Sequence, residues 1–153
     1  MEVLLNANMC DQDTYRIAKI LRSAFKVIQT DLCNDYGGTM EHLWIDFDLI
    51  ERRPFPFRFQ KKVGGGICKL TGLPTSVCKN VGHFSVRPDI QELLRVPPEL
   101  VVSYALNLVF ASTSVLIEKQ KKLGGFDAQR FRMDFLLSCK THGFEVSSND
   151  TKG

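Results

Sequence analysis

The stretch that decides the fold runs from Leu43 to Val63 and reads LWIDFDLIERRPFPFRFQKKV. Apolar residues fill every second position from Leu43 to Leu49, which places them on one face of a β-strand. After the turn-like residues 51–54 the alternation resumes with an aromatic row made of Phe55, Phe57 and Phe59. Residues 43–63 are therefore predicted to form a β-hairpin whose apolar face points to the core.

A first helix is predicted before this hairpin. Apolar residues recur at helical spacing from Ile17 to Leu32, until Gly37-Gly38 interrupts the pattern. Asp11 or Asp13 is expected to cap its N-terminus, because a short acidic side chain accepts hydrogen bonds from the first free amides of a helix.

Two further helices are predicted after the hairpin. The longest covers residues 98–123, because proline is favoured in the first turn of a helix and Pro98 stands at its start. Asp127 is expected to cap a last helix, which buries a stripe of side chains and ends at His142-Gly143. The stripe contains Phe131, Phe135 and Cys139.

A third strand is predicted over residues 83–87, which Pro88 ends. The expected class is therefore α+β, with a small antiparallel sheet packed against the long central helix and flanked by the N- and C-terminal helices. A chain of 153 residues with 44% hydrophobic content suits one domain, expected over residues 1–146, with a flexible tail over 147–153.

The cysteines and the charge restrict the setting of the protein. Five cysteines are scattered without a secretory segment before them, which favours reduced thiols and a cytoplasmic location. Cys68, Cys78 and His83 lie at spacings that match no compact zinc site, so no metal is expected. A formal charge of +3 permits an acidic partner without requiring one.

The residues from Leu100 to Ile117 carry no formal charge, which raises the question of a membrane span. Ser103, Asn107 and Ser114 fall on one narrow edge of this helix, which favours a buried core helix over a membrane helix. Membrane insertion is therefore not expected. The excess apolar surface leaves room for a homodimer, or for a structural subunit of a larger complex.

Basic residues provide the leading functional hypothesis, a noncatalytic binding or adaptor module that engages nucleic acid or an acidic protein surface. One group forms a stripe on the first helix, and a second surrounds the hairpin with Trp44 available for stacking. A charged but merely solvated surface is the competing interpretation. The residues are Arg16, Lys19, Arg22 and Lys26 on the helix, and Arg52, Arg53, Arg58 and Lys61 on the hairpin.

An enzymatic alternative comes from Asp46 followed by Gln60-Lys61-Lys62, whose spacing resembles the active site of restriction-endonuclease-like nucleases. Gln60 stands where that family usually has a second carboxylate. The resemblance implies that Asp46 and strand carbonyls hold a Mg²⁺ ion, while Lys62 positions or polarises the attacking water. Depending on the register of the predicted hairpin, Asp46 is expected to lie opposite Arg58 or Gln60. Apart from this Mg²⁺ ion, no cofactor is expected.

Overall fold

The computed structural model describes residues 1–63, 66–71, 81–119 and 125–146. The tail expected over 147–153, the end of the helix expected over 98–123, and Cys78 fall outside these ranges. The described elements are β1 (Glu2–Cys10), α1 (Tyr15–Asp31), β2 (His42–Leu49), β3 (Phe59–Val63), β4 (Gly66–Leu70), β5 (Val81–Arg87), α2 (Ile90–Arg95), a short 3-10 helix (Pro98–Leu100), α3 (Val101–Lys119) and α4 (Ala128–Thr141). The predicted α+β class is confirmed.

The strands form one five-stranded mixed sheet in the order β1-β2-β5-β4-β3. β1, β2 and β5 run parallel to one another, so that Leu4, Trp44 and His83 are aligned across them. β4 runs antiparallel to β5, and β3 runs antiparallel to β4 at the sheet edge. Of the three parallel strands, β1 and β2 come first in the chain and β5 comes last. The β3–β4 hairpin separates β2 from β5 in the sequence, although β2 and β5 are neighbours in the sheet.

The hairpin predicted over residues 43–63 is wrong. β2 lies between β1 and β5, and β3 pairs instead with β4, with Phe59 opposite Leu70. The alternation in β2 correctly identified its two faces, but a period of two carries no information about which strand lies alongside. The strand predicted over 83–87 exists as β5, but it runs parallel to β2 rather than in an antiparallel sheet.

Residues 50–58 form a loop rather than the start of a strand. Pro54 and Pro56 have no amide hydrogen to donate to a sheet ladder, which disfavours strand pairing here. The ring of Phe55 lies against the Arg87 guanidinium, 4.7 Å from its centroid, and Phe57 lies in the same way against the Lys69 ammonium at 4.9 Å. Both phenylalanines therefore lie outside the core to which the alternation had assigned them.

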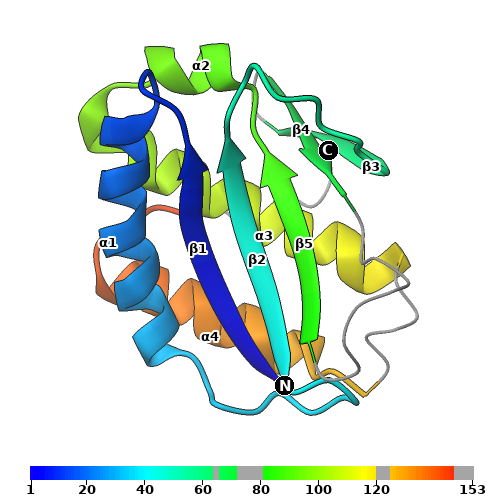
Figure 1. The fold of residues 1–153 in the computed structure, drawn as a ribbon. Coiled ribbons are helices and arrows are strands. Elements are labelled where there is room, and N and C mark those ends of the chain that lie inside the picture. Colours follow the sequence, from blue (N-terminus) through cyan, green and yellow to red (C-terminus); the bar gives the residue numbers. More distant parts are fainter. Residues whose placement is uncertain (64–65, 72–80, 120–124, 147–153) are drawn as a thin grey trace.

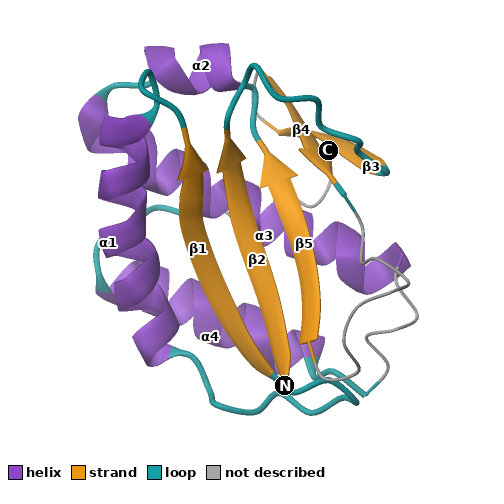
Figure 2. Ribbon diagram, viewed as in Figure 1, coloured by secondary structure: helices purple, strands orange, loops and turns teal. Residues whose placement is uncertain are grey.

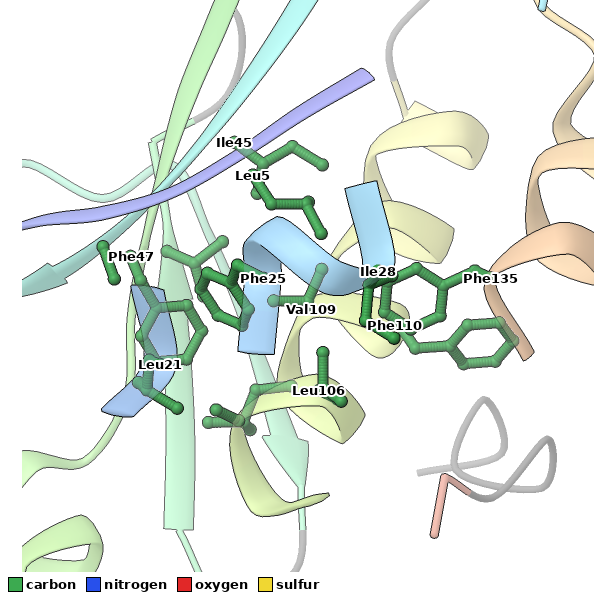
Figure 3. Packing of buried hydrophobic residues seen from close by; sticks show 14 of the residues in the cluster. Leu5, Leu21, Phe25, Ile28, Ile45, Phe47, Leu106, Val109, Phe110 and Phe135 are labelled. Carbon is green, nitrogen blue, oxygen red and sulfur yellow. The ribbon is translucent and has the colours of Figure 1, made fainter. Parts of the chain in front are cut away.

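One hydrophobic core lies between the sheet and the helices. Viewed toward β1, β2 and β5, the helices α3 and α4 lie behind the strands, and α1 lies beside β1 (Figure 1; Figure 2). The alternate residues of β2 that were expected to face inward are buried there, with Phe47 in edge-to-face contact with Phe25 of α1 (Figure 3). Phe110 of α3 stacks on Phe135 of α4 in the same core.

The predicted helix ends are correct at α4 and wrong at α1. The Asp127 carboxylate accepts a hydrogen bond from the Arg130 amide, as a capping residue should, and Phe131, Phe135 and Cys139 are buried. At α1 the capping position is occupied by Thr14. Asp11 instead accepts hydrogen bonds from the amides of Asp13 and Thr14 and so folds the loop that precedes the helix.

The helix α3, which carries no charge before Glu118, packs as a core helix. The window Pro98–Val115 is long and apolar enough to cross a membrane, but 56% of it is buried inside the protein. The predicted polar edge is used for internal contacts, because Asn107 donates to the Glu145 carbonyl and the Ser103 hydroxyl accepts from the Glu145 amide. The segment after α4 therefore returns along α3.

Side chains from α1 form hydrogen bonds with backbone groups of β1, which is an edge strand. Arg22 Nε donates to the Ala7 carbonyl at 3.1 Å, and the Leu5 amide donates to Gln29 Oε1 at 2.8 Å. These groups lie on a strand whose only sheet neighbour is β2. Unpaired groups on an edge strand are a template for association with another strand, so Arg22 and Gln29 protect this edge.

Replacing Arg22 and Gln29 together by alanine is expected to expose the β1 edge. The free energy of unfolding should fall by about 1–3 kcal/mol, since each hydrogen bond contributes about 0.5–1.5 kcal/mol. The exposed edge should also cause concentration-dependent association, measured by sedimentation velocity. The double variant Lys19→Ala/Lys26→Ala, which alters exposed residues of the same helix, is the control and should do neither. Equal behaviour of both variants would contradict the protective role.

Candidate binding surface on the open sheet face

The parallel strands have one face that points away from the core. Every described helix packs against the opposite face, apart from α2, which lies beyond the carboxyl ends of the strands (Figure 1). This is unusual, because parallel sheets are normally covered on both faces. We call this surface the open face. It is defined by Leu4, Asn6, Trp44, Asp46, His83 and Ser85.

Trp44 is the large aromatic residue at the centre of the open face. It is the only tryptophan in the chain and is 41% exposed. In register it lies between Leu4 of β1 and His83 of β5. A large apolar side chain held on a sheet and left in contact with solvent is available to stack against a planar ligand.

Asp46 and His83 form an ion pair next to Trp44. His83 Nε2 contacts Asp46 Oδ2, while the other carboxylate oxygen of Asp46 is buried and has no hydrogen-bond partner among the described residues. The Asp46 side chain is 15% exposed and that of His83 is 43% exposed. The hydrogen bond that His83 donates to the Asp46 carboxylate raises the pKa of His83 above its ordinary value, against an opposing effect of burial.

Asp48, the next outward residue of β2, does not belong to the exposed surface, because the loop after β2 and its own ion pairs bury it. It is buried at 2% exposure and bonds to Arg53 Nη2 at 2.6 Å and to Arg87 Nη2 at 3.3 Å. Arg87 also donates to the carbonyls of Arg53 and Ile50, at 2.7 Å and 2.6 Å. These bonds fasten the loop 50–58 over the carboxyl end of β5, so Asp48 and Arg53 have a structural role.

The β3–β4 hairpin carries basic residues beside the open face. Lys69 pairs in register with Arg87 of β5 and with Gln60 of β3, which puts all three on the outward side of the sheet. Lys62 is exposed on the same side of β3. Arg58, exposed just before β3, lies over the ring of Phe59 at 5.4 Å.

Several basic residues of the functional hypothesis lie elsewhere. Lys61 pairs with the buried Cys68 and so belongs to the inward side of the hairpin, while Arg52 is exposed in the loop beyond β2. The α1 stripe lies beside β1, and the hairpin lies at the opposite end of the sheet (Figure 1). Arg16, Lys19 and Lys26 are exposed on α1, whereas Arg22 turns to the β1 edge. The two basic groups are therefore separate.

The residues of the nuclease alternative are not brought together. Asp46 lies on β2, and Gln60 and Lys62 lie on β3, with β5 and β4 between them. Three strand spacings of about 4.8 Å put these residues about 14 Å apart. The expected position of Asp46 opposite Arg58 or Gln60 is wrong, because the partner of Asp46 on β5 is Ser85. Sequence reasoning missed His83 as a partner of Asp46, although its outward position in the strand 83–87 was a signal.

A cavity of about 410 Å³ lies beyond the carboxyl ends of the parallel strands. The Gln91 amide donates to both carboxylate oxygens of Glu51 there, which joins α2 to the loop after β2. In the part of the chain that the structure describes, no group of three acidic, histidine or cysteine side chains is arranged to hold a metal ion. The cavity is lined by Asp11, Asp13, Thr14, Glu51, Arg52, Ile90 and Gln91.

The fold and this surface define a class: an α+β protein whose five-stranded mixed sheet carries its long helices on one face and, among the described residues, leaves Trp44 exposed on the other. Comparison with protein-family models, with curated proteins and with solved structures finds no match. The function must therefore be inferred from the chemistry of the surface.

Proposed function

We propose that this protein is a noncatalytic module that binds single-stranded nucleic acid on its open face. The observation that carries the proposal is Trp44, an exposed indole on the open face, where it lies between Leu4 and His83 in register. Every nucleic-acid base has a planar face, and a single strand leaves that face free to stack on an aromatic side chain. An acidic protein surface, the other partner considered from the sequence, offers no run of unpaired planar bases for the indole to stack on.

The charges around Trp44 suit a polyanion. The acidic side chains of the open face and its border are paired, Asp46 with His83 and Glu2 with His42 at 3.3 Å. Lys62, Lys69 and Arg58 then supply positive charge on the adjoining hairpin. Basic side chains that contact phosphates provide most of the affinity in binding of this kind and make it depend on salt.

The distance across the surface suits a ligand of several nucleotides. Register relates Trp44 to Lys69 by two strand spacings and by the four residues from His83 to Arg87, which corresponds to about 16 Å. Phe57, 44% exposed and in contact with Lys69, offers a second aromatic ring at the far end. A single strand of nucleic acid lying between Trp44 and Lys69 would place a base at Trp44 and phosphates near the β3–β4 hairpin.

The single tryptophan makes the test direct. Titration with short single-stranded RNA and DNA should quench Trp44 fluorescence at about 50 mM salt, and binding should weaken strongly at about 200 mM. Heparin, a polyanion without bases, should compete without comparable quenching. Binding of heparin alone would point to an acidic protein surface as the partner and would contradict the proposal, as would the absence of quenching by any oligonucleotide.

Trp44→Ala is expected to weaken binding of a fluorescently labelled oligonucleotide by about 5- to 150-fold, measured by anisotropy. This range corresponds to the 1–3 kcal/mol that stacking of one base on an aromatic side chain contributes. Tyr15→Ala is the matched control, because Tyr15 is a 53% exposed aromatic residue on α1, away from the open face. A similar loss of affinity in both variants would argue against stacking at Trp44.

A further inference from the structure

We propose that His83 is a phosphate-binding residue, which contacts the nucleic-acid backbone next to the base stacked on Trp44. This inference rests on the proposed function and extends it to a residue that the basic pattern of the sequence did not include. It assigns to the Asp46–His83 pair a role beyond joining β2 to β5.

The position of His83 suits this role. It lies opposite Trp44 in the register of β2 and β5, whose backbones are about 4.8 Å apart. A base and its phosphate can therefore be contacted from neighbouring strands. Asp46 engages Nε2 of the ring, which fixes the ring and leaves Nδ1 to donate a hydrogen bond to a phosphate oxygen.

The charged groups around His83 are accounted for on β2, on β5 itself and on β4, whose Lys69 pairs in register with Arg87, four residues along β5 from His83. β2 contributes Asp46, the direct partner, and His42, which pairs with Glu2 of β1. On β5, Arg87 is held by Asp48 and by carbonyls of the loop 50–58. Among the described residues of the parallel strands, His83 is thus the cationic group placed beside Trp44 without being enclosed by the loop.

Binding through His83 should depend on pH. The hydrogen bond that the ring donates to the Asp46 carboxylate raises the pKa of His83 above its ordinary value, so the ring stays cationic to a higher pH than a free histidine. The phosphate contact should be complete at pH values below 6.5 and should be lost as the pH rises through the raised pKa. Stacking on Trp44 involves no proton and should persist at high pH.

The test measures oligonucleotide affinity by Trp44 quenching at about pH 5.5 and about pH 8.5. Loss of one charge-assisted hydrogen bond should weaken binding about tenfold at the higher pH. His83→Gln should remove this dependence, whereas His142→Gln, which alters the histidine at the end of α4, should retain it. An oligonucleotide with an uncharged methylphosphonate backbone should bind the natural protein without the pH effect.

Two further variants separate binding from folding. His83→Lys keeps a positive charge through this pH range and should bind without the pH dependence, even if His83→Gln is unstable. Asp46→Asn removes the charge that favours the imidazolium, so the loss of affinity should move to lower pH. Urea unfolding of each variant establishes that the titrated protein is folded.

The outcomes distinguish the two proposals. The role of His83 is overturned if the natural protein binds the oligonucleotide with equal affinity at both pH values, or if His83→Gln keeps the pH dependence. Binding at Trp44 stands in either case. If no single strand quenches Trp44 at low salt and either pH, the proposed function fails, and the role of His83 fails with it.

Discussion

Replacing Asp48 by alanine is expected to lower the free energy of unfolding by about 3–5 kcal/mol, the range observed when one partner of a buried ion pair is removed. Asp48 is 2% exposed and bonds to both Arg53 and Arg87. Without it the Arg87 guanidinium, whose side chain is 12% exposed, loses its buried counter-charge. A loss of this size is a large part of the 5–15 kcal/mol that holds a typical domain together.

Urea unfolding at neutral pH measures this change, with two variants for comparison. Arg53→Ala should cost less, because that side chain is 44% exposed and Arg87 still neutralises Asp48. Asp13→Ala alters an exposed carboxylate in the loop before α1 and should stay within about 0.5 kcal/mol of the natural protein. A cost below about 1 kcal/mol for Asp48→Ala would mean that the loop 50–58 is held by other contacts.

Gly37→Ala is expected to destabilise the protein by about 2–5 kcal/mol, through backbone strain and a steric clash that add together. Gly37 has φ +77°, a conformation that costs a residue with a side chain about 1–2 kcal/mol. A Cβ atom there would also lie 2.6 Å from the Gly125 carbonyl oxygen, so the segments 36–38 and 125–127 would have to separate. The bond from the Asp127 amide to the Tyr36 carbonyl joins these segments at 2.7 Å.

Gly143→Ala is a matched control for that substitution. Gly143 has the same φ of +77°, but a Cβ atom there would meet nothing within 4 Å. It should therefore show the conformational cost alone, about 1–2 kcal/mol. The difference between the two variants in urea unfolding isolates the close approach at Gly125. Equal costs would show that the segments can move apart freely.

The helices and the faces of the strands were predictable because they follow from local periodicity. The stripe of α4 and its cap at Asp127 were found in this way, as was the buried row of β2. A helix buries residues three and four apart and a strand buries every second one, whatever the rest of the chain does.

Strand order was not predictable in the same way. The neighbours of β2 are β1, which begins 40 residues earlier, and β5, which follows after the β3–β4 hairpin. Nothing in the pattern of residues 43–63 distinguishes these partners from the next segment of the chain, so the pattern alone favours pairing with the nearest segment. The phenylalanines at 55 and 57 reinforced that choice, although their rings lie against basic side chains on the outer surface.

The candidate surface was found in part. Trp44 and Asp46 were correctly assigned to the outward side of their strand, but their neighbours depended on the strand order. A parallel β5 brings His83 to Asp46 and takes Gln60 and Lys62 away from it. The grouping of side chains from different strands therefore required the structure.

The open face has a consequence for how this protein can change during evolution. Along β2, successive residues alternate between the core and the surface that we assign to binding, so core and contact residues are interleaved in one segment. Substitution at an outward position can alter the contacts and leave the core untouched. Deletion or insertion of a single residue would exchange the two sets, turning Trp44 inward and core side chains outward. The length of β2 is therefore constrained more tightly than the identity of its outward-facing residues.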